Sequence, residues 1–234
     1  MTSRIVEHGD GVAWMARAPL PPDHAIVTSL PDRTEVPDLG DGWAAWFVDT
    51  VALACRQVAD PAVAIFFQTD VRHDGLWIDK GALVARAAER AGSALLFHRI
   101  VCRKPPGTLT FGRATYSHLL GFARVLRARA DRARADVLPD AGWKPGTRSM
   151  GVRACLEACR FVRAETPTRT VVDPFCGYGT ALAVANALGL DSVGVDLSAR
   201  MCRRARRLEI DPATWASRAD ARAAIAQPPS PEAP

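Results

Sequence analysis

The chain has 234 residues, of which 48% are hydrophobic and 24% charged, a balance that suits a single globular domain. It contains no apolar run long enough to span a membrane, and its N-terminus lacks the pattern of a secretory signal, so we expect a cytoplasmic protein. The net charge is +5, and all but three of the 30 basic residues are arginine, whose planar guanidinium suits phosphate groups. A GC-rich genome would give the same arginine content, so charge alone is a weak indication of nucleic-acid binding.

Short apolar runs bounded by turn residues predict the strands, and they recur along most of the chain. In chain order these runs cover residues 4–10, 24–30, 62–70, 94–103, 117–124, 169–175 and 191–197. Apolar residues at helical spacing predict helices over 42–59, 80–92 and 149–165. Because helices alternate with about seven strands, we expect an α/β fold with a mostly parallel sheet.

Two internal segments and the C-terminal end lack this periodicity. Residues 31–42 are rich in Pro, Asp and Gly, and residues 125–148 form an Arg/Ala-rich stretch that runs into turn residues. We expect both to be irregular. We also expect one domain over residues 1–209, followed by a partly disordered extension over 210–234 that ends in "QPPSPEAP".

The clearest chemistry lies in "VVDPFCGYGTALAVANALGLDSVGVD", residues 171–196. A buried strand brings Asp173 to its carboxyl end, and Gly177 and Gly179 then let the backbone pass close to a ligand. The helix that begins near Thr180 directs its amide groups at the same space. Asp196 ends the next strand, 19 positions after Gly177, where an acid can accept hydrogen bonds from both ribose hydroxyls. This arrangement predicts a nucleoside cofactor.

The choice of cofactor depends on what the rest of the chain lacks. A dinucleotide-binding turn normally has a third glycine where this chain has Leu182, and it is followed by further strands. Fewer than 40 residues follow Asp196, so the remaining strands must lie upstream in a circularly reordered sheet. S-adenosylmethionine, which has an adenosine and a carboxylate but no pyrophosphate, fits better. The six cysteines are scattered without a CxxC pair, which favours buried thiols over a metal site.

The segment "DPFCGYGT" resembles the DPF-x-G-x-G-T motif of S-adenosylmethionine-dependent methyltransferases. The order of segments is similar to that of the circularly permuted beta-class DNA amino-methyltransferases. In that class a "GD" strand comes first, followed by a D-P-P-Y motif, the central strands and a K-P-containing helix. This chain has "EHGD" at 7–10, "SLPD" at 29–32 and "WKPG" at 143–146. The resemblance implies a Rossmann-like, permuted class I methyltransferase fold over residues 4–209.

The resemblance also implies roles for individual residues. The cofactor-binding residues that it indicates are Asp10, Ser149, Asp173, Phe175, Gly177, Gly179 and Asp196. Among them, Asp196 would hold the ribose and Asp10 would lie near the adenine amine. A turn or helix cap is the alternative for Asp10.

At the place of D-P-P-Y the chain reads Ser29-Leu30-Pro31-Asp32. In the family the first residue accepts a hydrogen bond from the target amine and the aromatic residue stacks on the flipped base. Serine is a weaker acceptor, and Asp32 cannot stack. Ser29 and Asp32 are nevertheless the catalytic candidates, with Asp32 orienting the acceptor or acting as a general base. A solvent-exposed turn acid is the alternative for Asp32.

The expected substrate is RNA, either tRNA or rRNA. DNA methyltransferases of this order usually insert a target-recognition segment where this chain has only about 125–142. Five arginines could form a phosphate-binding face, or be merely solvated: Arg124, Arg127, Arg129, Arg132 and Arg134. Two other functions remain open: a DNA methyltransferase without its own recognition domain, and a non-catalytic subunit that supports an active partner. A homodimer or partner subunit is expected, and no membrane association.

Overall fold

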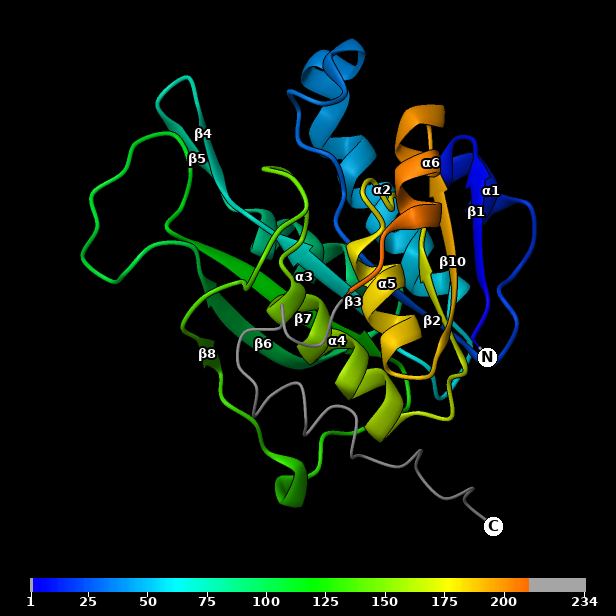
Figure 1. Cartoon of the computed structure of the whole chain (residues 1–234). Coiled ribbons are helices and arrows are strands. Elements are labelled where there is room, and N and C mark those ends of the chain that lie inside the picture. The colour runs from blue at the N-terminus through cyan, green and yellow to red at the C-terminus, as the bar shows by residue number, and fades with distance from the viewer. Residues whose placement is uncertain (1, 211–234) are drawn as a thin grey trace.

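The computed structural model describes residues 2–210, which form an eight-stranded sheet in the order β1-β10-β9-β2-β3-β7-β6-β8 (Figure 1). The strands are β1 (Arg4–His8), β2 (His24–Thr28), β3 (Ala64–Gln68), β6 (Ala94–Cys102), β7 (Tyr116–Ala123), β8 (Val137–Leu138), β9 (Thr170–Asp173) and β10 (Asp191–Asp196). The pairs from β1 through β3 are parallel, whereas β7 runs antiparallel to both β3 and β6. The predicted strands are confirmed, and β8 is an additional short edge strand.

The first strand of the sequence lies beside the last one. β1 pairs with β10 from Arg4 opposite Ser192 to His8 opposite Asp196. β10 also pairs with β9, and β9 in turn pairs with β2. The Arg4 guanidinium fixes this arrangement, because its Nε donates to Asn186 Oδ1 at 2.6 Å and its Nη1 to the Ala205 carbonyl at 2.9 Å. The Gly-rich half of the sheet is therefore completed by upstream strands, as the circular reordering requires.

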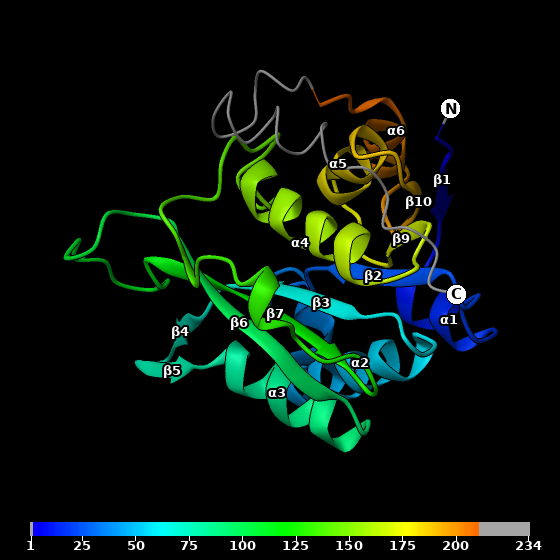
Figure 2. The same ribbon diagram turned by 90° about the horizontal axis from the view of Figure 1, so that it is seen from below.

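Helices cover both faces of the sheet (Figure 2). They are α1 (Gly11–Ala16), α2 (Trp43–Gln57), α3 (Lys80–Arg90), α4 (Val152–Glu165), α5 (Thr180–Ala187) and α6 (Ala199–Arg207). In β2, Ile26 belongs to the core under α1 to α3, whereas Ala25 and Val27 belong to the core under α4 and α5. Because both faces of β2 are buried, its sequence is apolar without alternation.

The segments expected to be irregular contain little regular structure. Residues 31–42 contain one 3₁₀ helix, η1 (Pro37–Gly42), and residues 125–148 contain only η2 (Ala130–Arg132) and β8. A small hairpin of β4 (Val71–His73) and β5 (Leu76–Ile78), which we did not predict, extends from the sheet beside the 103–115 loop (Figure 1). The predicted C-terminal extension lies, except for Ile210, outside the described residues. Within 2–210, no helix combines the length and the apolar character that a membrane crossing requires.

Candidate functional site

A cavity of about 420 Å³ lies at the carboxyl ends of β2, β9 and β10. β9 and β2 are neighbours in the sheet, but the chain leaves them in opposite directions, toward β10 and toward β3. Open α/β sheets bind their ligands at such a switch point. Six of the predicted site residues line the cavity: Ser29, Ser149, Asp173, Phe175, Gly177 and Asp196.

The two glycines of the turn have different tasks. Both have positive φ, +48° at Gly177 and +78° at Gly179, a conformation that residues with a side chain rarely adopt. A Cβ on Gly177 would meet nothing within 4 Å, so this position leaves room beside the cavity. A Cβ on Gly179 would lie 2.7 Å from Ala205 Cβ, so this glycine lets α5 and α6 pack closely. Gly179 does not line the cavity, contrary to the role expected for it.

Asp173 is buried at the floor of the cavity with half of its carboxylate satisfied. Its Oδ1 accepts the Thr28 hydroxyl at 2.6 Å and the Phe175 amide at 3.2 Å. Its Oδ2 is buried without a hydrogen-bond partner, and so is the hydroxyl of Thr180, which lines the same cavity. Burial raises the pKa of Asp173 to about 7. A ligand group that donates hydrogen bonds, such as an ammonium, would satisfy both Asp173 Oδ2 and Thr180 Oγ1.

Asp196, at the end of β10, holds the Gly-rich turn in place. Its Oδ2 accepts the Gly177 amide at 2.9 Å, and its Oδ1 accepts the Ser198 amide at 2.7 Å. Each carboxylate oxygen has two lone pairs, so the side chain can still accept hydrogen bonds from a ligand in the cavity. The turn and its acid therefore form one unit, which is the geometry that the sequence spacing predicts.

Asp10 does not contribute to this cavity. Its side chain is exposed, and its Oδ1 caps α1 by accepting the amides of Val12 at 2.7 Å and Ala13 at 3.1 Å. The helix-cap alternative is therefore the one that the geometry supports. Ser149 lines the cavity, but its hydroxyl donates to the Gly146 carbonyl at 2.7 Å and thus closes the loop before α4.

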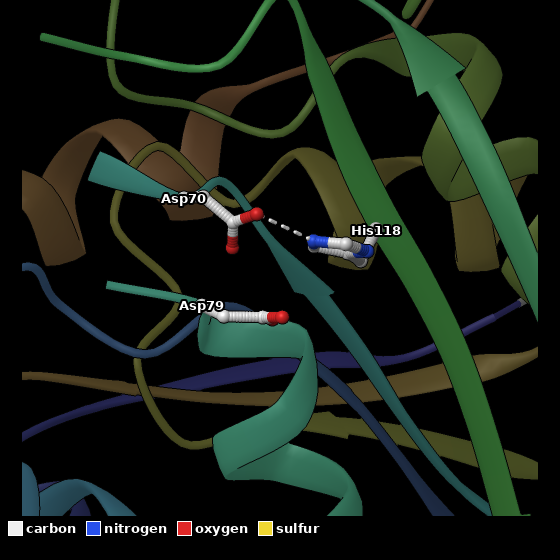
Figure 3. A group of neighbouring side chains, drawn as sticks. All are labelled: Asp70, Asp79 and His118. Carbon is white, nitrogen blue, oxygen red and sulfur yellow. Dashed lines mark hydrogen bonds and ion pairs between the residues drawn. The ribbon is translucent and has the colours of Figure 1, made fainter. Parts of the chain in front are cut away.

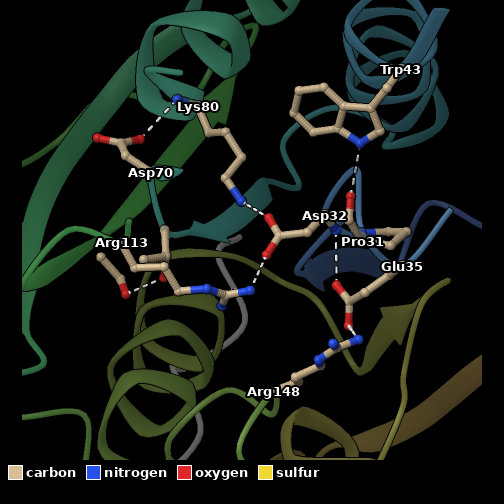
Figure 4. Close-up of polar contacts among 10 residues, drawn as sticks. Pro31, Asp32, Glu35, Trp43, Asp70, Lys80, Arg113 and Arg148 are labelled. Atoms are coloured by element: carbon tan, nitrogen blue, oxygen red, sulfur yellow. Dashed lines mark hydrogen bonds and ion pairs between the residues drawn. The ribbon is translucent and has the colours of Figure 1, made fainter. Parts of the chain in front are cut away.

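Asp32 faces a second, smaller cavity of about 50 Å³. Six residues line both cavities: Ser29, Leu30, Glu35, Thr147, Arg148 and Ser149. The Lys80 ammonium donates to one oxygen of Asp32, and the Arg113 guanidinium donates to the other at 2.8 Å (Figure 4). Asp32 is buried, which the alternative of a solvent-exposed turn acid does not fit. Because both of its oxygens accept from cations, Asp32 supports the cavity wall, and its general-base role stays a prediction.

The cations of this second cavity escaped the sequence analysis. The cavity is lined by five cations from three segments of the chain: Lys80, Arg103 with Arg113, and Lys144 with Arg148. No motif joins these positions in the sequence. Only the WKPG segment, which holds Lys144, gave a signal.

Asp70 follows β3 and belongs to a polar cluster with His118, which is also buried, and Asp79, which is exposed (Figure 3). His118 Nε2 lies 2.9 Å from Asp70 Oδ2, and the Lys80 amide donates to Asp70 Oδ1 at 2.8 Å. Asp79 caps α3 by accepting the Ala82 amide at 2.8 Å. These contacts give all three side chains structural tasks at the start of α3.

The arginines of residues 124–134, which could form a phosphate-binding face or be merely solvated, mostly make contacts within the chain. Arg124 donates to the carbonyls of Cys55 at 3.2 Å and Val58 at 2.6 Å, which ties this segment to the end of α2. Arg132 donates to the Ala164 carbonyl at 2.6 Å, and Arg129 pairs with Asp131 at 2.7 Å. Most of these guanidiniums therefore hold an irregular segment in place.

No known sequence family matches the chain, and no curated protein matches it significantly. Its fold is nevertheless similar to solved structures. A candidate DNA modification methylase from Thermus thermophilus, complexed with S-adenosyl-L-methionine, gives a TM-score of 0.66 at 19% identity over 86% of this chain and 91% of that one. The M1.HpyAVI complex with SAM gives 0.59 at 12% identity, with coverage of 87% and 98%. The cytosine-N4-specific PvuII DNA methyltransferase gives 0.64 at 12% identity, with coverage of 96% and 92%.

At these identities the likeness concerns the fold. It extends over nearly the whole length of each of these three proteins, so the permuted α/β architecture expected from the order of segments is confirmed.

Proposed function

We propose that this chain is an S-adenosylmethionine-dependent methyltransferase that acts on nucleic acid, with DNA as the favoured substrate. The observation that carries the proposal is the cavity at the switch point, in which Asp173 Oδ2 and the Thr180 hydroxyl are buried without partners. The fold neighbours include two proteins solved with this cofactor, which agrees with the shape of the site.

The residues present fit this cofactor. The unpartnered Asp173 oxygen suits the cofactor's ammonium group, and Asp196 suits the two ribose hydroxyls. The amides at the start of α5 suit a carboxylate, because Gly179 provides no side-chain cap there. When bound, the cofactor supplies an electrophilic methyl group on a sulfonium ion.

The acceptor would approach from the loop after β2. Ser29 is one of the residues that line both cavities, and it follows β2, so it lies between the cofactor and the acceptor. Its hydroxyl can accept a hydrogen bond from an amine and help to align it with the methyl group. With Asp32 engaged by two cations, positioning by the site carries most of the proposed catalysis.

DNA is favoured over RNA because the fold neighbours named for a substrate are DNA methylases. The RNA preference expected from the short segment 125–142 has no support among them. That segment contains no added domain, so we infer a DNA methyltransferase that needs a partner or an accessible single strand to choose its target.

Calorimetric titration with S-adenosylmethionine tests the cofactor site. Wild type should bind saturably, and Asp196→Ala should weaken binding by at least about tenfold because the ribose loses its acceptor. Asp191→Asn, at the opposite end of the same strand, is the matched control and should bind as wild type does. Absence of binding by folded wild type would contradict the proposal.

Transfer of a labelled methyl group then tests the substrate. Single-stranded DNA, duplex DNA and RNA of the same sequence are incubated with the protein, and the products are digested to nucleosides. Label in deoxynucleosides is the expected result, whereas label in ribonucleosides alone would reverse the preference for DNA. Cofactor binding without any transfer would support the non-catalytic subunit.

A further inference from the structure

The second cavity, here called the cationic pocket, has an unusual balance of charge. Five cationic side chains line it, from Lys80, Arg103, Arg113, Lys144 and Arg148, against the carboxylates of Asp32 and Glu35. It lies at the carboxyl ends of β2 and β3 and adjoins the cofactor cavity through shared wall residues. A group bound in it would therefore lie beside the methyl-transfer site.

The two acids are already engaged. Asp32 is shared between Lys80 and Arg113, and Glu35 Oε1 lies 3.3 Å from Arg148 Nη1 (Figure 4). Three cations thus have acid partners, whereas among residues 2–210 no carboxylate lies within 4.0 Å of the charged groups of Arg103 or Lys144. The pocket therefore has positive charge that the described part of the chain does not neutralise.

The cations of the pocket are shielded from water to different degrees, most completely at Lys80. Lys80 is 1% exposed, and burial is the main cause that lowers its pKa. Burial likewise lowers the pKa of Arg103 and of Lys144, and the nearby Arg113 guanidinium lowers both further. Placing cations together in a partly dry site is unfavourable unless an anion joins them.

Gln68 provides an independent indication of a ligand. This residue ends β3, is 1% exposed and lines the cationic pocket. Its amide nitrogen Nε2 is buried with no hydrogen-bond partner. A buried donor that the protein leaves unsatisfied, next to unneutralised cations, matches an oxygen of an anionic group.

The surroundings of the pocket favour a nucleic acid over a small anion. Arg72 lies over the rings of Trp77 and Phe111, at 5.1 and 5.4 Å from their centroids. Trp77 is 42% exposed and Phe111 is 85% exposed. Arg113, which lines the pocket, follows Phe111 by two residues and forms a β-bridge with Val71, next to Arg72. The backbone therefore connects the two exposed rings directly to the wall of the pocket. Exposed rings beside a cationic groove are typical of single-strand binding, because bases stack on them.

We propose that the cationic pocket binds a backbone phosphate of the strand that carries the methyl-accepting nucleotide, through Arg103, Lys144 and the amide of Gln68. This rests on the proposed function and identifies the part of the substrate that the acceptor side recognises. Anchoring the phosphate would hold the nucleotide beside Ser29 without reading its base.

The test measures binding of a fluorescent single-stranded DNA oligonucleotide by anisotropy over a range of salt concentrations. Arg103→Gln combined with Lys144→Gln should weaken binding by about tenfold and lower the salt slope by about one. Arg200→Gln combined with Arg203→Gln, which removes the same charge from the exposed face of α6, is the matched control and should change affinity by less than about threefold. Equal losses in the two double variants would overturn the proposal.

A second measurement separates an anchored phosphate from general attraction. Neutral methylphosphonate linkages are placed one at a time along the oligonucleotide. At one position, the neutral linkage should weaken binding to wild type but have no further effect on binding to the pocket variant. The neutral linkage and the double substitution would then remove the same contact. Uniform effects at all linkages would contradict an anchored phosphate, and so would competition by inorganic phosphate as effective as that by the oligonucleotide.

Calorimetry with S-adenosylmethionine on the same variants keeps the two proposals apart. The pocket variant should bind the cofactor with unchanged affinity, which also shows that it is folded. Suppose that wild type binds the oligonucleotide with sensitivity to a single linkage but does not bind the cofactor. This result would refute the proposed function and would still support the phosphate site.

Discussion

The cofactor half and the acceptor half of the site are built in different ways. The cofactor half is a continuous stretch from β9 to β10, with unpartnered acceptors on Asp173 and Thr180. The acceptor half collects five cations from three segments and gives Asp32 two of them. The first half has a buried carboxylate oxygen without a donor, and the second has positive charge in excess. The difference indicates that one side suits a cationic ligand group and the other an anionic one.

The largest expected effect comes from the acceptor half, because its central acid supports the structure. Asp32→Asn removes the charge that faces the buried Lys80 ammonium and should lower the free energy of unfolding by about 3–5 kcal/mol. Urea denaturation measures it, with Asp38→Asn in the exposed turn as the control. Adding Lys80→Met should recover much of the loss. A loss below about 1 kcal/mol would mean that Asp32 is free to act chemically.

The cofactor half should be most sensitive at Gly179. Gly179→Ala places a methyl group 2.7 Å from Ala205 Cβ at a φ of +78°, and should cost about 2–4 kcal/mol of stability. Gly177→Ala is the matched control, since its Cβ meets no atom within 4 Å, and it should cost about 1–2 kcal/mol for the backbone alone. Thermal unfolding compares the two. Equal losses would show that the contact between α5 and α6 is not tight.

The buried carboxylate predicts how the cofactor half responds to pH. Burial raises the pKa of Asp173 from 3.8 to about 7, so a ligand ammonium must displace a proton below that pH. Affinity for S-adenosylmethionine should rise about tenfold per pH unit up to about pH 7 and level off above it. Asp173→Asn should flatten the profile, and Asp191→Asn should keep it. A flat wild-type profile would remove Asp173 from the site.

The same pKa shift predicts the direction in which the stability of the unliganded protein changes with pH. The folded protein holds the Asp173 proton more tightly than the unfolded chain does, so its contribution to stability is full below about pH 4. That contribution is lost as the pH rises through about 7. Unfolding titrations in urea should show wild type losing stability relative to Asp173→Asn over this interval.

The smallest effect is expected where the sequence looked most basic. Arg129→Gln should change the affinity for single-stranded DNA by less than about twofold, because Arg129 already pairs with Asp131 at 2.7 Å. Arg103→Gln should have a clearly larger effect in the same anisotropy assay. A reversed order would return nucleic-acid binding to the Arg/Ala-rich segment.

The two halves also differ in how far the sequence predicts them. The unit from Asp173 to Asp196 is local: strand, turn, helix and acid follow one another, so their spacing predicts their geometry. The permuted sheet follows from the shortage of strands after that unit. The cationic pocket is non-local, because Gln68 and Lys144 meet only through the strand order of the finished sheet. Asp10 was misplaced for a related reason, since helix capping competes with ligand binding for a carboxylate at a strand end.

The pairing of β1 with β10 has a consequence for how the protein is made. β1 leaves the ribosome long before its partner β10, which ends at Asp196, so the nascent strand stays unpaired while the residues between them are made. The contact between Arg4 and Asn186 has a similarly high contact order, which slows folding and leaves β1 exposed in the meantime. Relocating β1 to follow α6 by circular permutation would make that pairing local, and such a variant should refold faster and aggregate less during synthesis.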